Sequence, residues 1–146
     1  MDPDAIEPPL SSRRVVGARI VLVPYLVLLG LVVFLPAREA GRVTGIVGWL
    51  AEALATVGIP REPAAVVLEF LANVVLFTPF GVLLVLAFPG VRWWAVVLTG
   101  FLSSIGIELV QLGIPSRVAS VSDVIANTTG TALGLVLARS WRRGRR

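Results

Sequence analysis

The chain contains no cysteine and no histidine, and two classes of chemistry are excluded with them. Without cysteine there are no disulfides and no thiolates. Without histidine the commonest metal ligand, the usual general base and the H-E-x-x-H zinc motif are all missing. Charge is scarce as well: 15% of the 146 residues are charged, against about 25% in an average soluble domain.

Apolar residues take the place of charge along most of the chain. Hydrophobic residues make up 56% of it, and its mean hydropathy is +0.89. The apolar stretches form four runs, each close to the roughly 20 residues needed to cross a hydrocarbon core of about 30 Å. These runs are residues 18–35, 65–88, 93–114 and 122–139, of which the last is the least apolar. We predict an all-α membrane protein, a four-transmembrane-helix bundle whose partner is the lipid bilayer.

A shorter segment between the first two runs, residues 42–59, has a different pattern. Its apolar residues recur at i, i+3, i+4, i+7, i+8 and i+11, which places them on one face of a helix. They are Ile46, Trp49, Leu50, Ala53, Leu54 and Val57. This pattern predicts a short amphipathic helix lying in the membrane interface. A re-entrant hairpin element is the alternative.

Arginine placement predicts how the chain is oriented in the cell membrane. Every basic residue is an arginine, and most lie at or outside the outer ends of the first and fourth runs: Arg13, Arg14, Arg19, Arg139, Arg142, Arg143, Arg145 and Arg146. Such flanks stay in the cytoplasm, so both termini are predicted to be cytoplasmic, which requires an even number of spans. We predict a disordered cytoplasmic tail at residues 1–17, a transmembrane domain at 18–140 and a basic cytoplasmic tail at 141–146. The net charge of +4 is then explained by topology, and we expect no nucleic-acid partner.

Polar side chains interrupt three of the spans, and with this topology they lie at one depth near the outer surface. They are Glu69 and Asn73 on the second span, Glu108 and Gln111 on the third, and Asp123 and Asn127 on the fourth, with Arg117 in the outer connection. Each pair is three or four residues apart and therefore shares one face of its helix. A carboxylate inside a span costs at least about 2.5 kcal/mol, which makes it a candidate functional residue. We predict that these seven residues form one outward-facing, ligand-binding polar pocket.

A structural explanation of the same side chains stays open. Hydrogen bonds between polar side chains hold membrane helices together, at about 0.6 kcal/mol each on average. This role accounts equally well for Asn73, Ser104, Gln111 and Asn127. Arg117 and Asp123 are close enough in sequence to form a structural salt bridge.

Glycine and proline in the second and fourth spans are interpreted as structural. Gly130 and Gly134 match the small-xxx-small pattern that lets two membrane helices approach closely, and Gly81 is a candidate for the same role. Pro79 removes a helix hydrogen bond and frees the carbonyl group of Val75. That carbonyl needs another donor, from a nearby side chain or a neighbouring helix.

Three blocks of the sequence resemble the VanZ-like family of small bacterial membrane proteins. They are "EFLANVVLFTPFGVLL", "SSIGIELVQ" and "SRVASVSDVIANTTGTALG", in that order along the chain. They match the family's pattern of an Asn followed by F-x-P-F-G, then S-x-x-x-E-x-x-Q, then R-x-x-x-x-x-D-x-x-x-N-x-x-G. The resemblance covers residues 18–140. It implies a link to low-level resistance to the glycopeptide teicoplanin, with which the family's founding member is associated.

Three functions remain open from the sequence. The first is a non-enzymatic envelope protein whose outward pocket binds a cell-wall precursor or lipid-linked ligand and so alters glycopeptide access. The second is a membrane enzyme acting on a lipid or lipid-linked substrate, with Glu69, Glu108 and Asp123 as acid–base groups or cation ligands. The third is a small transporter or channel subunit. We favour the first, name no catalytic residue and expect no cofactor or resident metal.

Overall fold

In the computed structural model, residues 11–34, 45–114 and 119–144 are described. They form the helices α1 (Ser12–Phe34), α3 (Gly45–Thr56), α4 (Arg61–Ala87), α5 (Trp93–Gln111) and α6 (Val121–Arg143). No strand occurs within these three ranges. Four of the helices, α1, α4, α5 and α6, are long and apolar enough to cross a membrane. The predicted all-α fold with four membrane spans is therefore confirmed.

The helices extend beyond the predicted spans at several ends. Helix α1 begins at Ser12, six residues before the apolar run, and α6 continues to Arg143. Helix α4 begins at Arg61 and carries Pro63 in its first turn, where a missing N–H is tolerated. Hydropathy marks only the part of a helix that is apolar, so polar terminal turns lie outside the predicted ranges.

Helices α4 and α6 run parallel to each other and meet along a line of glycines, which we call the glycine seam. A Cβ atom on Gly130 would lie 2.3 Å from the carbonyl oxygen of Val74, and one on Gly134 would lie 2.1 Å from that of Thr78. On the α4 side of the same contact, a Cβ atom on Gly81 would lie 2.1 Å from the carbonyl oxygen of Thr131 in α6. Only glycine permits such an approach of two backbones. The predicted packing role of the three glycines is confirmed.

Helix α1 packs on the second half of α4, close to the proline inside that helix. Leu29 and Val33 of α1 pack against Phe77 and Phe80, whose rings meet edge to face with centroids 5.9 Å apart. The Tyr25 hydroxyl donates to the carbonyl of Leu76, just before Pro79. A neighbouring helix thus supplies a hydrogen-bond donor in this turn. The donor binds the carbonyl group of Leu76, whereas the prediction concerned the carbonyl group of Val75.

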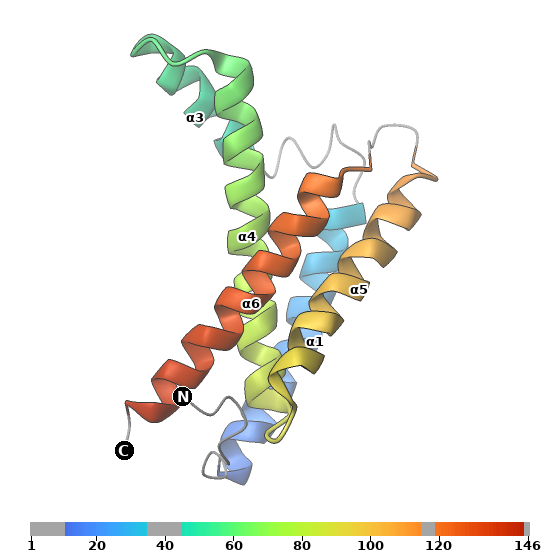
Figure 1. Cartoon of the computed structure of the whole chain (residues 1–146). Coiled ribbons are helices and arrows are strands. Elements are labelled where there is room, and N and C mark those ends of the chain that lie inside the picture. Colours follow the sequence, from blue (N-terminus) through green and yellow to red (C-terminus); the bar gives the residue numbers. More distant parts are fainter. Residues whose placement is uncertain (1–10, 35–44, 115–118, 145–146) are drawn as a thin grey trace.

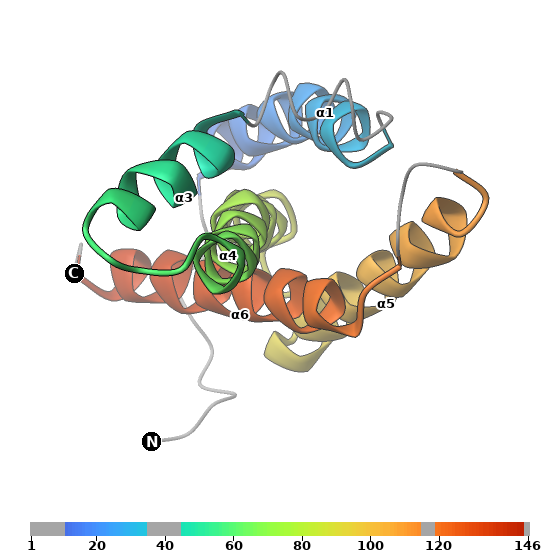
Figure 2. The same ribbon diagram turned by 90° about the horizontal axis from the view of Figure 1, so that it is seen from above.

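Helix α3 packs on the first half of α4 and projects from the bundle, as Figures 1 and 2 show. It is the short helix expected between the first two spans. Its predicted apolar face is divided: Leu50 and Leu54 are partly buried, whereas Trp49 is 68% exposed. Ala51, outside the predicted face, is buried. Because apolar residues occur on more than one side of α3, one side packs on α4 and another remains available to the membrane interface.

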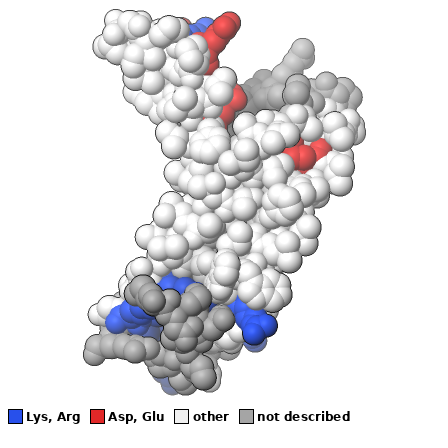
Figure 3. Space-filling model, viewed as in Figure 1, with Lys and Arg blue, Asp and Glu red and all other residues white. Residues whose placement is uncertain are grey.

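The two ends of the bundle differ in charge (Figure 3). Helices α1 and α5 begin, and α4 and α6 end, at what we call the arginine end, where most of the described arginines lie. At the opposite end, which we call the acidic end, lie the described carboxylates: Glu52, Glu62, Glu69, Glu108 and Asp123. The start of α1 and the end of α6 thus share one side, as an even number of spans requires.

Candidate functional site

Polar side chains of α5 and α6 face each other between these two antiparallel helices. We call this buried polar cluster the polar seam. Its residues are Ser104, Glu108 and Gln111 on one face of α5, with Ser120, Asn127 and Thr131 at and along α6, and the hydrogen bond of Gln111 goes to α1. Except for Ser120, which is partly buried, all of them are buried. Ser104, Glu108 and Gln111 recur at i, i+4 and i+7, which is why one face of α5 carries all three.

Asn127 lies in the middle of the polar seam and joins its two helices. Its Nδ2 donates a hydrogen bond of 2.8 Å to the hydroxyl oxygen of Ser104. Its backbone carbonyl accepts a hydrogen bond of 2.9 Å from the hydroxyl of Thr131, one turn along α6. The predicted polar stripes of the third and fourth spans therefore do meet.

The side-chain oxygen of Asn127 is different, because no described residue donates a hydrogen bond to it. Asn127 is 3% exposed, and its Oδ1 is buried without a hydrogen bond among the described residues. A buried acceptor left unsatisfied costs about 1–3 kcal/mol. Such an atom needs a donor that the described helices do not provide, which a water molecule or the N–H or O–H of a ligand can supply.

Glu108 fastens the start of α6 to the end of α5. Its Oε2 accepts a hydrogen bond of 2.7 Å from the backbone N–H of Ser120, the N-cap residue of α6. A carboxylate beside a helix N-terminus is also stabilised by the helix dipole. The carboxyl group of Glu108, which is only 8% exposed, thus has a defined structural role.

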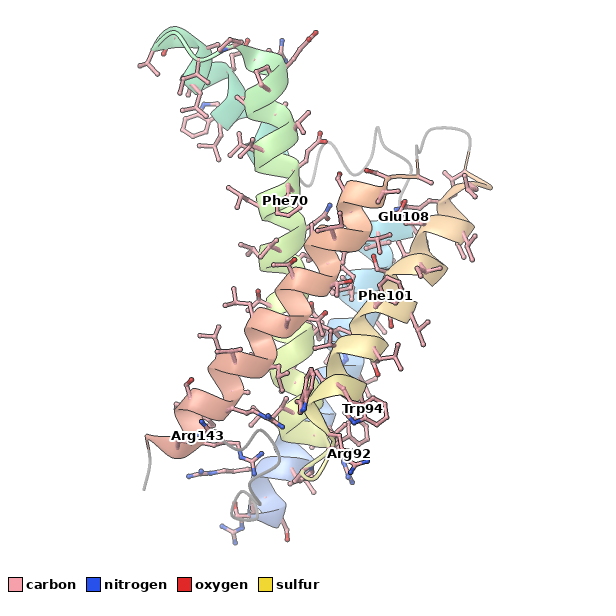
Figure 4. All side chains as sticks on the ribbon, in the orientation of Figure 1. Phe70, Arg92, Trp94, Phe101, Glu108 and Arg143 are labelled. Atoms are coloured by element: carbon pink, nitrogen blue, oxygen red, sulfur yellow. The ribbon has the colours of Figure 1, made fainter. Side chains whose placement is uncertain are left out.

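Gln111 makes the corresponding contact with α1. Its Nε2 donates a hydrogen bond of 2.9 Å to the carbonyl oxygen of Val33. Val33 lies in the last turn of α1, where backbone carbonyls have no partner within the helix. Glu108 and Gln111 together tie the end of α5 to the start of α6 and the end of α1. Figure 4 labels Glu108 near this end of α5.

Glu69 and Asn73 of α4 lie beside this cluster but are not joined to it. Asn73 precedes Val74, which touches Gly130 of α6, so Asn73 and Asn127 lie at similar levels of two parallel helices. Asn73 is partly buried and Glu69 is exposed. Within the described part of the chain, neither of the two makes a hydrogen bond to another site residue. Their membership of a shared pocket stays a prediction.

The remaining site residues lie around the start of α6. Asp123 is partly buried in the first turn, where a negative charge suits the helix dipole. Its Oδ1 is 3.5 Å from the Ser122 hydroxyl, which is a weak contact. Arg117, and with it the suggested salt bridge to Asp123, lies outside the described residues.

Two members of the polar seam were not predicted from the sequence. Thr131 is fully buried, and Gly100 of α5 lies against its side chain. Thr131 follows Asn127 by four residues, so helical periodicity places it on the same face of α6 and could have predicted it. Ser120 donates its backbone N–H to Glu108, and no pattern of side chains predicts such a backbone contact. The hydroxyl of Ser120 accepts a hydrogen bond from the N–H of Ser122, which is a helix cap that can be recognised from the sequence.

The arrangement offers hydrogen-bonding groups rather than a metal centre. Among the described residues, no group of three or more Asp, Glu, His or Cys side chains is placed to hold a metal ion. The groups present are carboxylates, carboxamides and hydroxyls, with one open acceptor on Asn127. They suit recognition of a ligand that carries hydroxyl or amide N–H groups.

Comparison with known proteins gives one match. The family model VanZ/LLP1 matches residues 22–142, which is most of the chain. The match covers α4 and α5 completely, α6 up to its last residue, and α1 from Leu22 onward. No curated protein matches the chain, and no solved structure does.

Proposed function

Because this chain belongs to the VanZ/LLP1 family, we propose that it is a VanZ-like membrane protein of the bacterial cell envelope that binds a ligand at the acidic end. The ligand is a cell-wall precursor or another lipid-linked molecule. Its binding alters the access of glycopeptides of the teicoplanin type to their target. The pocket that we propose is formed by the polar seam together with Glu69, Asn73, Asp123 and Arg117.

The observation that carries this proposal is the open acceptor of Asn127. Inside a membrane an unsatisfied polar atom is more costly than at a wetted surface, because lipid offers no hydrogen bond. The carboxamide of Asn127 is buried, and its Oδ1 has no hydrogen-bond partner among the described residues. A hydroxyl or amide N–H from a sugar or peptide portion of the ligand would satisfy that oxygen.

The distribution of arginines supports the outward orientation of this pocket. Arginine-rich ends of membrane helices stay in the cytoplasm, and the polar seam residues Glu108 and Gln111 lie in the last turns of α5, at the opposite end. With the arginine end inside, the pocket opens toward the face where glycopeptides act. The use of Glu108 to bind the Ser120 N–H favours binding over acid–base catalysis.

The test is a deletion strain that expresses wild-type protein, Asn127→Leu or Thr129→Val at matched membrane levels. Thr129 is the matched control, because it is exposed on α6 and bonds only to its own helix through the Ile125 carbonyl. Relative to the deletion strain, wild type and Thr129→Val should change teicoplanin susceptibility by the same amount. Asn127→Leu should leave the susceptibility of the deletion strain unchanged.

Lipid extracts from the same strains separate binding from catalysis. We expect extracted lipids to be unchanged by deletion, and a lipid-linked molecule to co-purify with wild type but not with Asn127→Leu. Full activity of Asn127→Leu contradicts the proposed site. A lipid product that disappears on deletion contradicts the non-enzymatic function.

A further inference from the structure

The arginine end of the bundle gathers positive charge from three separate segments. The start of α1, the connection before α5 and the last turns of α6 contribute Arg13, Arg14, Arg19, Arg92, Arg139, Arg142 and Arg143. The described carboxylates all lie at the acidic end. Figure 3 shows the resulting basic surface at the lower end of the molecule.

Two of these arginines are held in place by the ends of neighbouring helices. The guanidinium of Arg14 lies over the ring of Trp141, 5.9 Å from its centroid. That of Arg19 lies 5.6 Å from the centroid of Phe88, and its Nε donates a hydrogen bond of 3.0 Å to the Ala87 carbonyl. Fixed side chains lose less conformational entropy when they bind a ligand. The surface is therefore partly preorganised.

Three other arginines are exposed and have no carboxylate partner among the described residues. Arg13 lies in the first turn of α1, Arg92 is the N-cap residue of α5 and Arg143 ends α6. A guanidinium presents a planar set of donors that matches the oxygens of a phosphate group. Arg92 precedes two exposed tryptophans, of which Figure 4 labels Trp94.

We propose that the arginine end binds the phosphodiester headgroups of anionic phospholipids in the leaflet that it faces. Tryptophan side chains prefer the depth of the headgroups. The helix ends that carry these arginines also expose large apolar side chains, among them Ile20, Phe88 and Val136. A lipid phosphate is thus presented at the depth of Arg92, whereas a soluble polyanion is not. This site lies at the opposite end from the proposed pocket and does not depend on it.

The test uses the full-length protein purified in a non-ionic detergent, titrated with phosphatidylglycerol or phosphatidylcholine. Bound lipids are counted by native mass spectrometry, and the thermal unfolding temperature is followed in parallel. We expect phosphatidylglycerol to bind and to raise the unfolding temperature, and phosphatidylcholine to do neither. Raising the ionic strength from about 0.01 M to about 1 M shortens the Debye length from about 30 Å to about 3 Å and should remove most of the difference.

Arg92→Gln and Arg61→Gln provide a matched pair, since each removes one exposed arginine from a different end of the bundle. We expect Arg92→Gln to weaken phosphatidylglycerol binding about fivefold, which corresponds to about 1 kcal/mol for one arginine near a lipid surface. Arg61→Gln should bind like wild type. Arg143→Gln replaces Arg92→Gln if the latter unfolds. Equal binding of the two lipids, or equal loss in the variants from both ends, overturns the proposal.

Discussion

Helix α6 has two contact faces that are built on opposite principles. On the α4 side, the glycine seam brings backbone against backbone, and a Cβ atom added to Gly134 would lie only 2.1 Å from a carbonyl oxygen of α4. On the α5 side, the polar seam keeps hydrogen-bonding side chains between the helices, and one of them, Asn127, retains an open acceptor. The first face leaves no room for change, whereas the second leaves a group free to bind.

This difference explains why α6 is the least apolar span. A helix facing lipid on most sides needs apolar residues, but α6 uses glycine against α4 and amide and hydroxyl groups against α5. We infer that the glycine seam fixes the bundle and that the polar seam can be devoted to recognition. Substitutions on the two faces should therefore separate stability from activity.

The largest effect is expected when the glycine seam is broken. Gly134→Ala places a methyl group against the backbone of α4 and should destabilise the fold by about 3 kcal/mol. Gly106→Ala on α5 is the control, because a Cβ atom there meets nothing within 4 Å. Detergent-extracted monodisperse yield and unfolding temperature measure the result. Equal behaviour of the two variants contradicts the close α4–α6 contact.

A smaller effect is expected from the carboxylate that joins the two helices of the polar seam. Glu108→Ala leaves the Ser120 N–H without its acceptor and should cost about 2 kcal/mol of stability. Glu108→Gln keeps an acceptor oxygen and should cost about 1 kcal/mol or less, through the lost charge at the helix N-terminus. Unfolding temperatures of the two variants test this order. If both lose the same stability, the charge and not the hydrogen bond is what α6 requires.

The centre of the polar seam should tolerate the loss of its polar groups. In the double variant Ser104→Ala/Asn127→Leu both partners of a buried hydrogen bond become apolar, and the open acceptor disappears as well. Stability should stay within about 1 kcal/mol of wild type, because paired replacement of buried polar groups is often neutral. Teicoplanin susceptibility should nevertheless return to that of the deletion strain. A loss of folded protein would identify Asn127 as a packing residue.

The smallest change in stability is expected on α4, outside both seams. Glu69 is exposed and has no hydrogen bond in the described structure, so Glu69→Gln should alter stability by less than about 0.5 kcal/mol. If Glu69 belongs to the ligand pocket, the same variant should lose the susceptibility phenotype at unchanged expression. Retained activity removes α4 from the proposed site and leaves the polar seam alone.

The sequence predicted the polar seam better than the pocket as a whole. Periodicity showed that Ser104, Glu108 and Gln111 share one face, and the facing stripe of α6 contains Asn127 as expected. It did not show that Glu108 and Gln111 bind backbone groups, since every residue carries an N–H or a carbonyl and none is marked in the sequence. Which direction a stripe faces also depends on how the helices pack.

Helix packing likewise explains the differences at α3 and α4. A stripe identifies residues on a common face, but only the assembled bundle decides whether that face meets protein or lipid. Leu50 is partly buried, whereas Trp49, assigned to the same face, is exposed. Glu69 is exposed for the same reason, because the first half of α4 extends away from α5 toward α3 (Figure 1).

The position of α6 after the other three spans in the sequence has a consequence for biogenesis. It leaves the ribosome after α1, α4 and α5, and its polar residues make it, of these four spans, the one least able to remain in lipid alone. By then α4 is already available in the membrane, and its backbone around Val74 and Thr78 offers the surface into which Gly130 and Gly134 fit. Insertion of the last span is thus coupled to its docking on an earlier one. A truncated chain that ends before Ser120 lacks both faces of α6, so quality-control proteases should remove it even though its other three spans are strongly apolar.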